Sequence, residues 1–294
     1  MVVAMAAFTF NDTLSKLAAQ TINPGQLMLV RGLFATTLIS LLAWQQGALK
    51  GYRNYWHPMV FLRLVGEVGG TVCFLAALPH LPLANISAVL QALPLAVTMG
   101  AALFLGEAVG WRRWLAIATG FGGVLIIVRP GFEGFNAFSL LALLSVAFCA
   151  VRDLATRKIP GHIPSLFVST TTTIIITITG ALTIVPFGGW VPMTPNLVAF
   201  LAGAAVLVLF GYQFVIMAMR EGEISFIAPF RYTALIWALS LSVFVFGDIP
   251  DLAMIAGAAV IVASGLYSLY RERVVGKGRP AAESTSASMA PDGI

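Results

Sequence analysis

The sequence predicts an all-α integral membrane protein with ten transmembrane helices, arranged as two inverted five-helix repeats with both termini in the cytoplasm. Apolar residues make up 59% of the 294 residues and charged residues only 10%, which is too little polar surface for a soluble domain. The apolar residues also form a series of long segments. Finally, the chain matches itself at a constant offset of 141 residues, which pairs Asp12 with Asp153 and Gly106 with Gly247 without a gap.

Each span is predicted from its length and its boundaries. A helix needs roughly 20 residues to cross about 30 Å of hydrocarbon, and a lone strand leaves its backbone unsatisfied in lipid. Turns rich in Pro or Gly, such as residues 23–25 and 79–82, separate neighbouring segments. The predicted spans are residues 2–22, 25–45, 60–79, 83–105, 112–129, 137–158, 163–186, 196–219, 224–246 and 252–271.

Basic residues predict which way the spans run. With the N-terminus inside, most of the 17 Lys and Arg residues lie in or beside internal loops. The exceptions are Lys16, Arg31, Arg129 and Arg231. Five spans then separate the repeats, so the second enters the bilayer upside down, a construction found in secondary transporters. The predicted units are a first repeat over residues 1–131, a second over 132–273, and a disordered cytoplasmic tail over 274–294.

Charge and motifs argue against several other classes of protein. The net charge of +5 falls in short loops, where orientation explains it, so nucleic acid is not an expected partner. The chain lacks the patterns G-x-x-x-x-G-K-[ST], H-E-x-x-H and G-x-S-x-G, so we expect no ATP, no metal and no enzyme activity. An intramembrane enzyme and a non-transporting scaffold are the less favoured alternatives. We expect a multi-pass protein of a bacterial inner membrane, as a monomer or homodimer.

Four segments carry a family resemblance. The second span has Arg31 in LMLVRGLFATTLI, the fourth contains Pro94 and closes with Gly106-Glu107, and the fifth begins WRRWLAIATGFGGVLIIVRPG. The second copy has APFRYTALIWALSLSVFVFGD, with Leu235 in place of Pro94. Over residues 1–272 the chain resembles EamA-type members of the drug/metabolite transporter superfamily. The resemblance implies a substrate cavity between the repeats, alternating access to the two membrane faces, and no cofactor.

Charged side chains within spans are the main functional signal, because burying one in a bilayer costs at least about 2.5–3.5 kcal/mol. In the first span, Asn11, Asp12 and Lys16 share a polar face. Asp12 and Lys16 are spaced to pair with each other; they neutralise each other or line the cavity, and Lys16 could also snorkel outward. Arg31 clamps helix-terminal carbonyls, pairs with Asp12, or holds a substrate carboxylate with two parallel hydrogen bonds.

Two more spans of the first repeat carry candidates. Glu67 either pairs with Arg63, which would make it structural, or stays free to carry a coupling proton. Gln91 belongs to a polar stripe of the fourth span and is large for a tight helix interface, so we expect it in the cavity. Pro94 removes a backbone hydrogen bond and bends the same helix, at a position suited to a moving gate.

The sixth span repeats the polar pair of the first. Asp153 is the repeat partner of Asp12 and is spaced to pair with Arg157, as Asp12 is with Lys16. Because inversion places these pairs toward opposite membrane faces, we hypothesise that they form the outer and inner gates. The adjacent Arg152 either takes part in a gate or is a positive residue at the end of a helix.

The substrate-binding candidates of the second repeat are Tyr212, Gln213, Arg231, Tyr232 and Trp237. Arg231 lies about two turns into the ninth span, too deep for easy snorkelling, and Glu67 or Asp153 is its expected structural partner. Tyr232 is the repeat partner of Gln91. The other three could add an aromatic and polar wall, although aromatic residues in spans also serve as packing or interface anchors.

Three other features are expected to be structural. Glu107 lies next to Arg112 and Arg113, where an interface or loop salt bridge is the default. Asp248 faces the outside with Asp251 nearby. The Thr-rich face of the seventh span, Thr170, Thr173 and Thr177, is expected to bond to its own helix.

Taken together, the intramembrane charges predict a transporter of a small polar metabolite. The bases Lys16, Arg31, Arg152 and Arg231 outnumber the acids Asp12, Glu67 and Asp153 by one. This excess favours an anionic or zwitterionic substrate, such as an amino acid or a carboxylate, with proton coupling as a further hypothesis. The aromatic residues leave a flat substrate open, such as a riboflavin-like vitamin or a drug. The sequence does not distinguish import from export.

Overall fold

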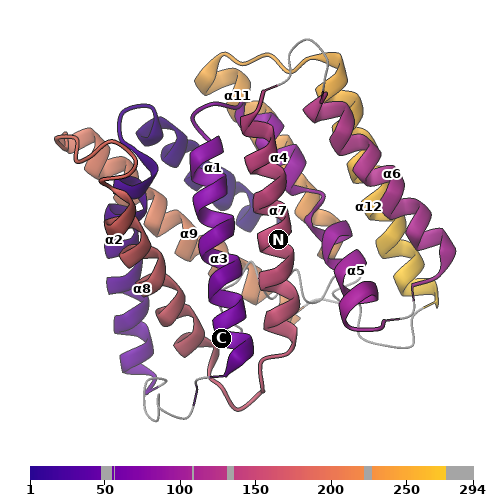
Figure 1. Ribbon diagram of the computed structural model, residues 1–294, viewed down its shortest axis with the longest axis horizontal. Coiled ribbons are helices and arrows are strands. Elements are labelled where there is room, and N and C mark those ends of the chain that lie inside the picture. The colour runs from indigo at the N-terminus through magenta and orange to yellow at the C-terminus, as the bar shows by residue number, and fades with distance from the viewer. Residues whose placement is uncertain (48–54, 56, 108, 131–135, 222–226, 276–294) are drawn as a thin grey trace.

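The computed structural model describes residues 1–47, 55, 57–107, 109–130, 136–221 and 227–275, and within them it contains helices and turns but no strand (Figure 1). Of the predicted tail over residues 274–294, residues 274 and 275 continue the last helix, and the rest lies outside the described part. The first repeat comprises α1 Val2–Ala19, α2 Pro24–Gln45, α3 Pro58–Ala77, α4 Leu83–Leu90, α5 Leu93–Phe104 and α6 Trp111–Val128. The second comprises α7 Phe138–Arg157, α8 Ser165–Thr183, α9 Pro195–Glu221, the 3-10 helix η2 Ala228–Tyr232, α11 Thr233–Phe246 and α12 Leu252–Val275.

Local sequence signals set several helix ends. α2 begins at Pro24, and the side chain of Asn23 caps it by accepting a hydrogen bond of 2.8 Å from the backbone N–H of Gln26. Proline suits the first turn because its missing N–H would have no partner within the helix. α11 ends at Phe246, and Gly247 caps it with a φ of 71°, the left-handed conformation that glycine adopts at little cost.

Nine stretches within the described residues are long and apolar enough to cross a membrane. The consecutive helices α4 and α5 lie in one of them, Leu83–Phe104, and η2 and α11 together contain another, Pro229–Phe246. Helix α1 is not among the nine and carries the polar residues Asn11, Asp12 and Lys16. It completes the predicted bundle of ten. The chain is therefore a multi-pass integral membrane protein.

Both repeats break their fourth span at the same place. α4 stops and α5 restarts around Gln91, and η2 gives way to α11 at Tyr232, the residue that the offset of 141 pairs with Gln91. Pro94 lies in the first turn of α5, so the break comes just before it, as expected of a residue that cannot continue a preceding turn. Leu235 stands at the equivalent position of the second repeat, so proline is not required for the break.

The main helix contacts join one repeat to the other. α2 packs against α8 and α6 against α12 (Figure 1), while the pair α3–α7 is matched by the pair α9–α1. Exchanging the repeats therefore maps this set of contacts onto itself. Glycines allow the close approach: a Cβ added to Gly180 would lie 2.5 Å from the backbone N of Leu29, and one added to Gly123 would lie 2.8 Å from the carbonyl O of Gly257. Small residues at such contacts hold helices together in lipid.

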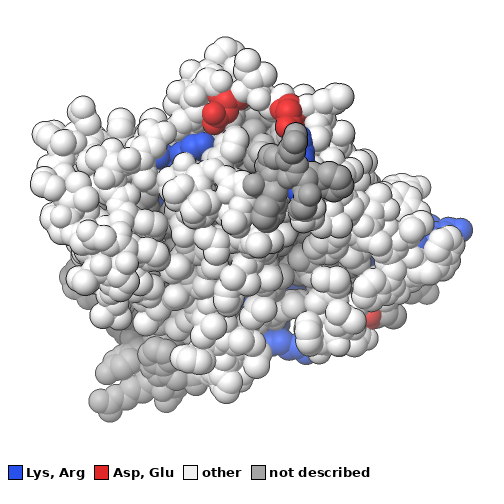
Figure 2. Space-filling model, turned by 45° about the horizontal axis from the view of Figure 1, so that its top comes forward, with Lys and Arg blue, Asp and Glu red and all other residues white. Residues whose placement is uncertain are grey.

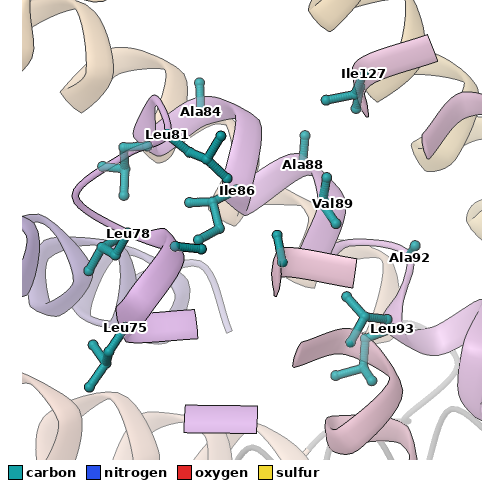
Figure 3. Close-up of a cluster of buried hydrophobic side chains, with 14 of the residues drawn as sticks. Leu75, Leu78, Leu81, Ala84, Ile86, Ala88, Val89, Ala92, Leu93 and Ile127 are labelled. Atoms are coloured by element: carbon teal, nitrogen blue, oxygen red, sulfur yellow. The ribbon is translucent and has the colours of Figure 1, made fainter. Parts of the chain in front are cut away.

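The largest apolar cluster includes the turn between α3 and α4. Leu78, Leu83 and Ile86 are fully buried there, and Figure 3 shows Leu75, Leu78 and Leu81 following one another from α3 into the turn. On the outside, the face in Figure 2 is mostly free of charge, and its Lys, Arg, Asp and Glu side chains occupy a few small patches. Exposed apolar side chains such as Phe61 and Leu115 suit contact with lipid tails.

Candidate functional site

A cavity of about 260 Å³ lies between the two repeats. α1, α2 and α3 line it from the first repeat and α7, α8 and α9 from the second, with Leu90 and Leu93 at the broken fourth span. None of its described lining residues comes from α6, α11 or α12. The polar lining side chains are Asn11, Asp12, Arg31, Arg63, Glu67, Thr71, Ser145, Cys149, Arg152, Thr172, Thr173 and Tyr212.

Arg31 reaches the cavity from α2 and is held only loosely. Its Nη1 donates to Oδ1 of Asn11 and to Oγ of Ser15, each at 3.4 Å, which is long for an N–H···O bond. Among the described residues it forms neither of the predicted structural contacts, the clamp on helix-terminal carbonyls or an ion pair with Asp12. Because a guanidinium has five N–H donors, most of its bonding capacity is available to a ligand.

Asp12 also lines the cavity, within electrostatic range of Arg31. Its Oδ1 accepts a hydrogen bond of 2.9 Å from the side-chain amide of Asn11. The predicted pair with Lys16 does not form, since the Nζ of Lys16 donates to the Leu81 carbonyl at 2.7 Å and lies 3.5 Å from Oδ2 of Asp248. Lys16 sits one turn nearer the end of α1, where these oxygens from other segments satisfy its charge outside the cavity.

Glu67, unlike Asp12, is held by two arginines. Its Oε2 lies 3.2 Å from Nη1 of Arg63 and 3.4 Å from Nη1 of Arg152. Arg152 in turn places its Nε 2.8 Å from Oδ1 of Asp153. Of the two alternatives for Glu67, the pair with Arg63 is the one that forms. The four side chains make a charged network that ties α3 to α7 on one wall of the cavity.

The predicted pair of Asp153 with Arg157 is also replaced by another contact. Nη2 of Arg157 lies 2.6 Å from Oε1 of Glu107, while Asp153 binds Arg152. Sequence spacing favoured neighbours on the same helix, but the close packing of α5 against α7 brings a partner from the other repeat within reach. Glu107 therefore forms a salt bridge across the interface with the second repeat, one of the two structural arrangements that the sequence suggested for it.

The structure brings six of the sequence candidates to the cavity and leaves eight away from it. The six are Asn11, Asp12, Arg31, Glu67, Arg152 and Tyr212, and the eight are Lys16, Gln91, Pro94, Asp153, Gln213, Arg231, Tyr232 and Trp237. Gln213 is exposed on α9. Trp237 packs on Phe10, with ring centroids 6.3 Å apart. The hydroxyl of Tyr232 packs closely against Gly265 of α12. A Cβ added to that glycine would lie only 1.8 Å from the hydroxyl oxygen.

Arg231 is buried but does not line the cavity. Only 8% of the residue's surface is exposed, and its Nη1 has no hydrogen-bond partner within the described residues. It interacts electrostatically with Asp153, one of its two expected structural partners. In this conformation its charge therefore faces Asp153, and Arg231 does not line the cavity.

Sequence reasoning missed several lining residues. Arg63, expected at the cytoplasmic edge, is 1% exposed and lines the cavity. Thr172 and Thr173 donate their hydroxyls to the carbonyls of Val168 and Thr170. Of the Thr-rich face, Thr173 and Thr177 bond to their own helix as expected, whereas the buried hydroxyl of Thr170 has no hydrogen-bond partner within the described residues. The bonds of Thr172 and Thr173 leave hydroxyl oxygens that can only accept hydrogen bonds from a ligand.

The constant offset between the repeats could have predicted some of these residues. The offset of 141 relates lining residues to one another: Phe8 to Cys149, Asn11 to Arg152, Gly32 to Thr173, and Thr71 to Tyr212. The cavity is thus built from equivalent positions of the two repeats. Transferring each candidate of one repeat to its partner in the other would have predicted Thr71 from Tyr212.

The family model and the named relatives that match this chain are all transporters. Residues 1–129 match the model of the EamA-like transporter family. The chain is 26% identical over 272 residues to the pseudopaline exporter CntI of Pseudomonas aeruginosa strain UCBPP-PA14, covering 90% of this chain and 93% of that protein. It is 32% identical over 212 residues to the riboflavin transporter of Vibrio cholerae serotype O1, covering 71% and 69%. A solved crystal structure shares the fold with a TM-score of 0.59 at 19% identity, covering 93% of this chain and 98% of that one.

Proposed function

The chain belongs to the EamA-like transporter family of the drug/metabolite transporter superfamily, and from that premise we propose that it carries a small anionic or zwitterionic metabolite through its central cavity. The substrate is amino-acid-like or carboxylate-like. It reaches the cavity from one membrane face and leaves from the other by alternating access between the inverted repeats. The bacterial relatives indicate the inner membrane as the site of this transport.

One observation carries the substrate class: Arg31 and Asp12 line the same cavity, and neither forms an ion pair with another residue in the part of the chain that the structure describes. A free guanidinium can bind a carboxylate with two parallel, charge-assisted hydrogen bonds. A nearby free carboxylate can bind an ammonium group, and the acceptor oxygens of Thr172 and Thr173 would assist it. Asp12 could instead exchange a proton, which makes it a better candidate for coupling than the doubly paired Glu67.

A flat aromatic substrate is the second candidate. The similarity to a riboflavin transporter and the position of Tyr212 in the cavity wall favour it. Two observations weigh against it. The cavity of about 260 Å³ is smaller than the roughly 300–1,000 Å³ of sites for drug-sized ligands, and Tyr232 and Trp237 lie away from the cavity in this conformation.

A thermal-shift experiment on the purified full chain tests the proposal. Amino acids, dicarboxylates and riboflavin are added in turn to the parent protein, to Arg31→Ala and to Asp12→Asn. We expect an amino acid to stabilise the parent but neither variant. A dicarboxylate should stabilise Asp12→Asn but not Arg31→Ala, because only the arginine meets a carboxylate.

The matched control is Arg112→Ala, which removes an exposed arginine at the start of α6. It should respond to ligands as the parent does. Stabilisation by riboflavin alone would favour the second candidate. Equal ligand responses in the parent and in Arg31→Ala would rule out the assigned site.

A further inference from the structure

Two ion pairs connect the repeats in the same way. Lys16 near the end of α1 lies 3.5 Å from Asp248, just after α11. Arg157 at the end of α7 lies 2.6 Å from Glu107, just after α5. In each case the base lies in the last turn of the first helix of one repeat, and the acid follows the broken fourth span of the other repeat.

The internal repeat relates the two pairs to each other. By the offset of 141, Arg157 is the equivalent of Lys16, and Asp248 is the equivalent of Glu107. The same contact is therefore made twice, with base and acid exchanged between the repeats. The contact is present at both symmetry-related positions although the two bases differ and the two acids differ.

The pairs lie at opposite ends of the molecule. In Figure 1 the turn from α11 to α12, which holds Asp248, is at the top, and the segment between α5 and α6, which holds Glu107, is at the bottom. Each base also continues a cavity-lining helix. Lys16 follows Asp12 by one turn, and Arg157 follows Arg152 by little more than one.

We propose that these two ion pairs are latches that close the cavity at its two ends, so that opening toward either membrane face requires one latch to break while the other holds. The proposal rests on the proposed function, since it assumes alternating access. Both latches are formed in this structure. Because each connects a cavity-lining helix to the opposite repeat, separating the repeats at one end must stretch the latch at that end.

The two latches differ in their surroundings. Lys16 also donates to the Leu81 carbonyl at 2.7 Å and lies 4.5 Å from the centre of the Phe246 ring. It stays partly satisfied if Asp248 is lost. Arg157 has one described partner, Glu107, and its Nη1 is buried without a hydrogen bond. Breaking the Glu107 latch should therefore have the larger effect on the conformational equilibrium.

Thiol labelling from one side at a time tests the proposal. Thr71 lines the cavity and is replaced by Cys, in a full chain whose native Cys73 and Cys149 are replaced by Ser. A membrane-impermeant methanethiosulfonate reagent is applied to right-side-out or inverted vesicles. We expect Asp248→Asn to raise the labelling rate severalfold from one side only, and Glu107→Gln to raise it from the opposite side only, by a larger factor.

The control is Asp251→Asn. Asp251 pairs with Arg129 across the repeats, but it joins α6 to α12, which do not line the cavity. Its removal should leave both labelling rates unchanged. Exchanging the charges at the other latch, in the double variant Glu107→Arg, Arg157→Glu, should return the rate to that of the parent, because Glu107 is the one described partner of Arg157; loss of folding could not produce this recovery.

Several results would overturn the proposal. These are unchanged rates in both latch variants, increases from the same side in both, or an equal response in the control. The readout requires no substrate, so it is separate from the substrate assignment. Side-specific labelling in a protein that no amino acid or carboxylate stabilises would uphold the latches and refute the proposed substrate.

Discussion

Two carboxylates line the same cavity and have very different surroundings. Glu67 contacts Arg63 and Arg152, and Arg152 also contacts Asp153. Asp12 accepts one hydrogen bond from Asn11 and faces Arg31, which itself makes only two long hydrogen bonds. Both sites bury charge inside a membrane bundle. Only the second keeps unused bonding capacity on an acid and a base together.

This difference teaches that intramembrane charge alone does not identify a binding site. A buried charge needs partners, and the Glu67 network supplies them from within the protein. The Asp12–Arg31 site supplies few, so a ligand of complementary charge can provide the rest. Removing a residue from the first group should therefore damage the protein, and removing one from the second should damage binding.

The largest expected effect is on the Glu67 network. Glu67→Gln removes the acid that faces both Arg63 and Arg152, leaving buried guanidinium groups with less compensation. Breaking a buried ion pair costs about 3–5 kcal/mol, so thermal unfolding in detergent should shift strongly downward. Asp12→Asn is the matched comparison and should shift it little, since Asp12 has no ion-pair partner among the described residues. Equal shifts in the two variants would remove the distinction between the sites.

The next effect concerns affinity. Hydrogen bonds to charged groups contribute about 1.5–3 kcal/mol, so Arg31→Ala should weaken binding of a carboxylate ligand roughly 10- to 100-fold. Arg31→Lys keeps the charge but loses the planar fork, and its affinity should fall between those of the parent and Arg31→Ala. Isothermal titration of the purified variants measures the series. An arginine that serves only as a structural clamp would instead lower the thermal stability and leave the affinity unchanged.

The same comparison explains how far the sequence could predict this protein. The helical bundle and its repeat followed from long apolar segments and from the constant offset, because a membrane leaves few other options for the backbone. The charged residues of the cavity followed from the cost of burying them, as Asp12, Arg31 and Glu67 illustrate. Helix boundaries followed where Pro, Asn or Gly fixed a cap.

The partners of these charges could not be predicted in the same way. Spacing along one helix favoured Lys16 with Asp12 and Arg157 with Asp153, but both bases bind acids of the opposite repeat. A helix offers a few neighbours at fixed spacing, whereas packing between repeats brings in residues that spacing does not reveal. The Glu67–Arg63 pair was predictable because no closer competitor displaced it.

A smaller effect should come from the contact that holds the Glu67 network in place. A Cβ added to Gly66 would lie 2.7 Å from the backbone N of Arg152, so Gly66→Ala must push α3 away from α7. Overpacking of this kind costs about 1–3 kcal/mol. The variant should lower the unfolding temperature by less than Glu67→Gln does. Gly122→Ala is the control, because its added Cβ would meet nothing within 4 Å, and it should match the parent.

The smallest effect is expected at an ion pair outside the membrane-spanning segments. Asp251 accepts a hydrogen bond from the backbone N–H of Met254 at 2.7 Å and pairs with Arg129, and these contacts lower its pKa. A carboxyl whose pKa is lower in the folded state stabilises the protein above its unfolded pKa of about 3.9. That contribution is lost as the pH falls through the folded value.

Thermal unfolding of the parent and of Asp251→Asn should therefore differ slightly at pH 6 and converge as the pH drops below about 4. Asparagine retains the capping oxygen at the start of α12, so the difference reports the ion pair with Arg129. An exposed pair contributes little, and this one should be far weaker than the Glu67 network. A loss comparable to that of Glu67→Gln would show that burial does not separate structural from dispensable charge in this protein, and the contrast between Glu67 and Asp12 would then need another explanation.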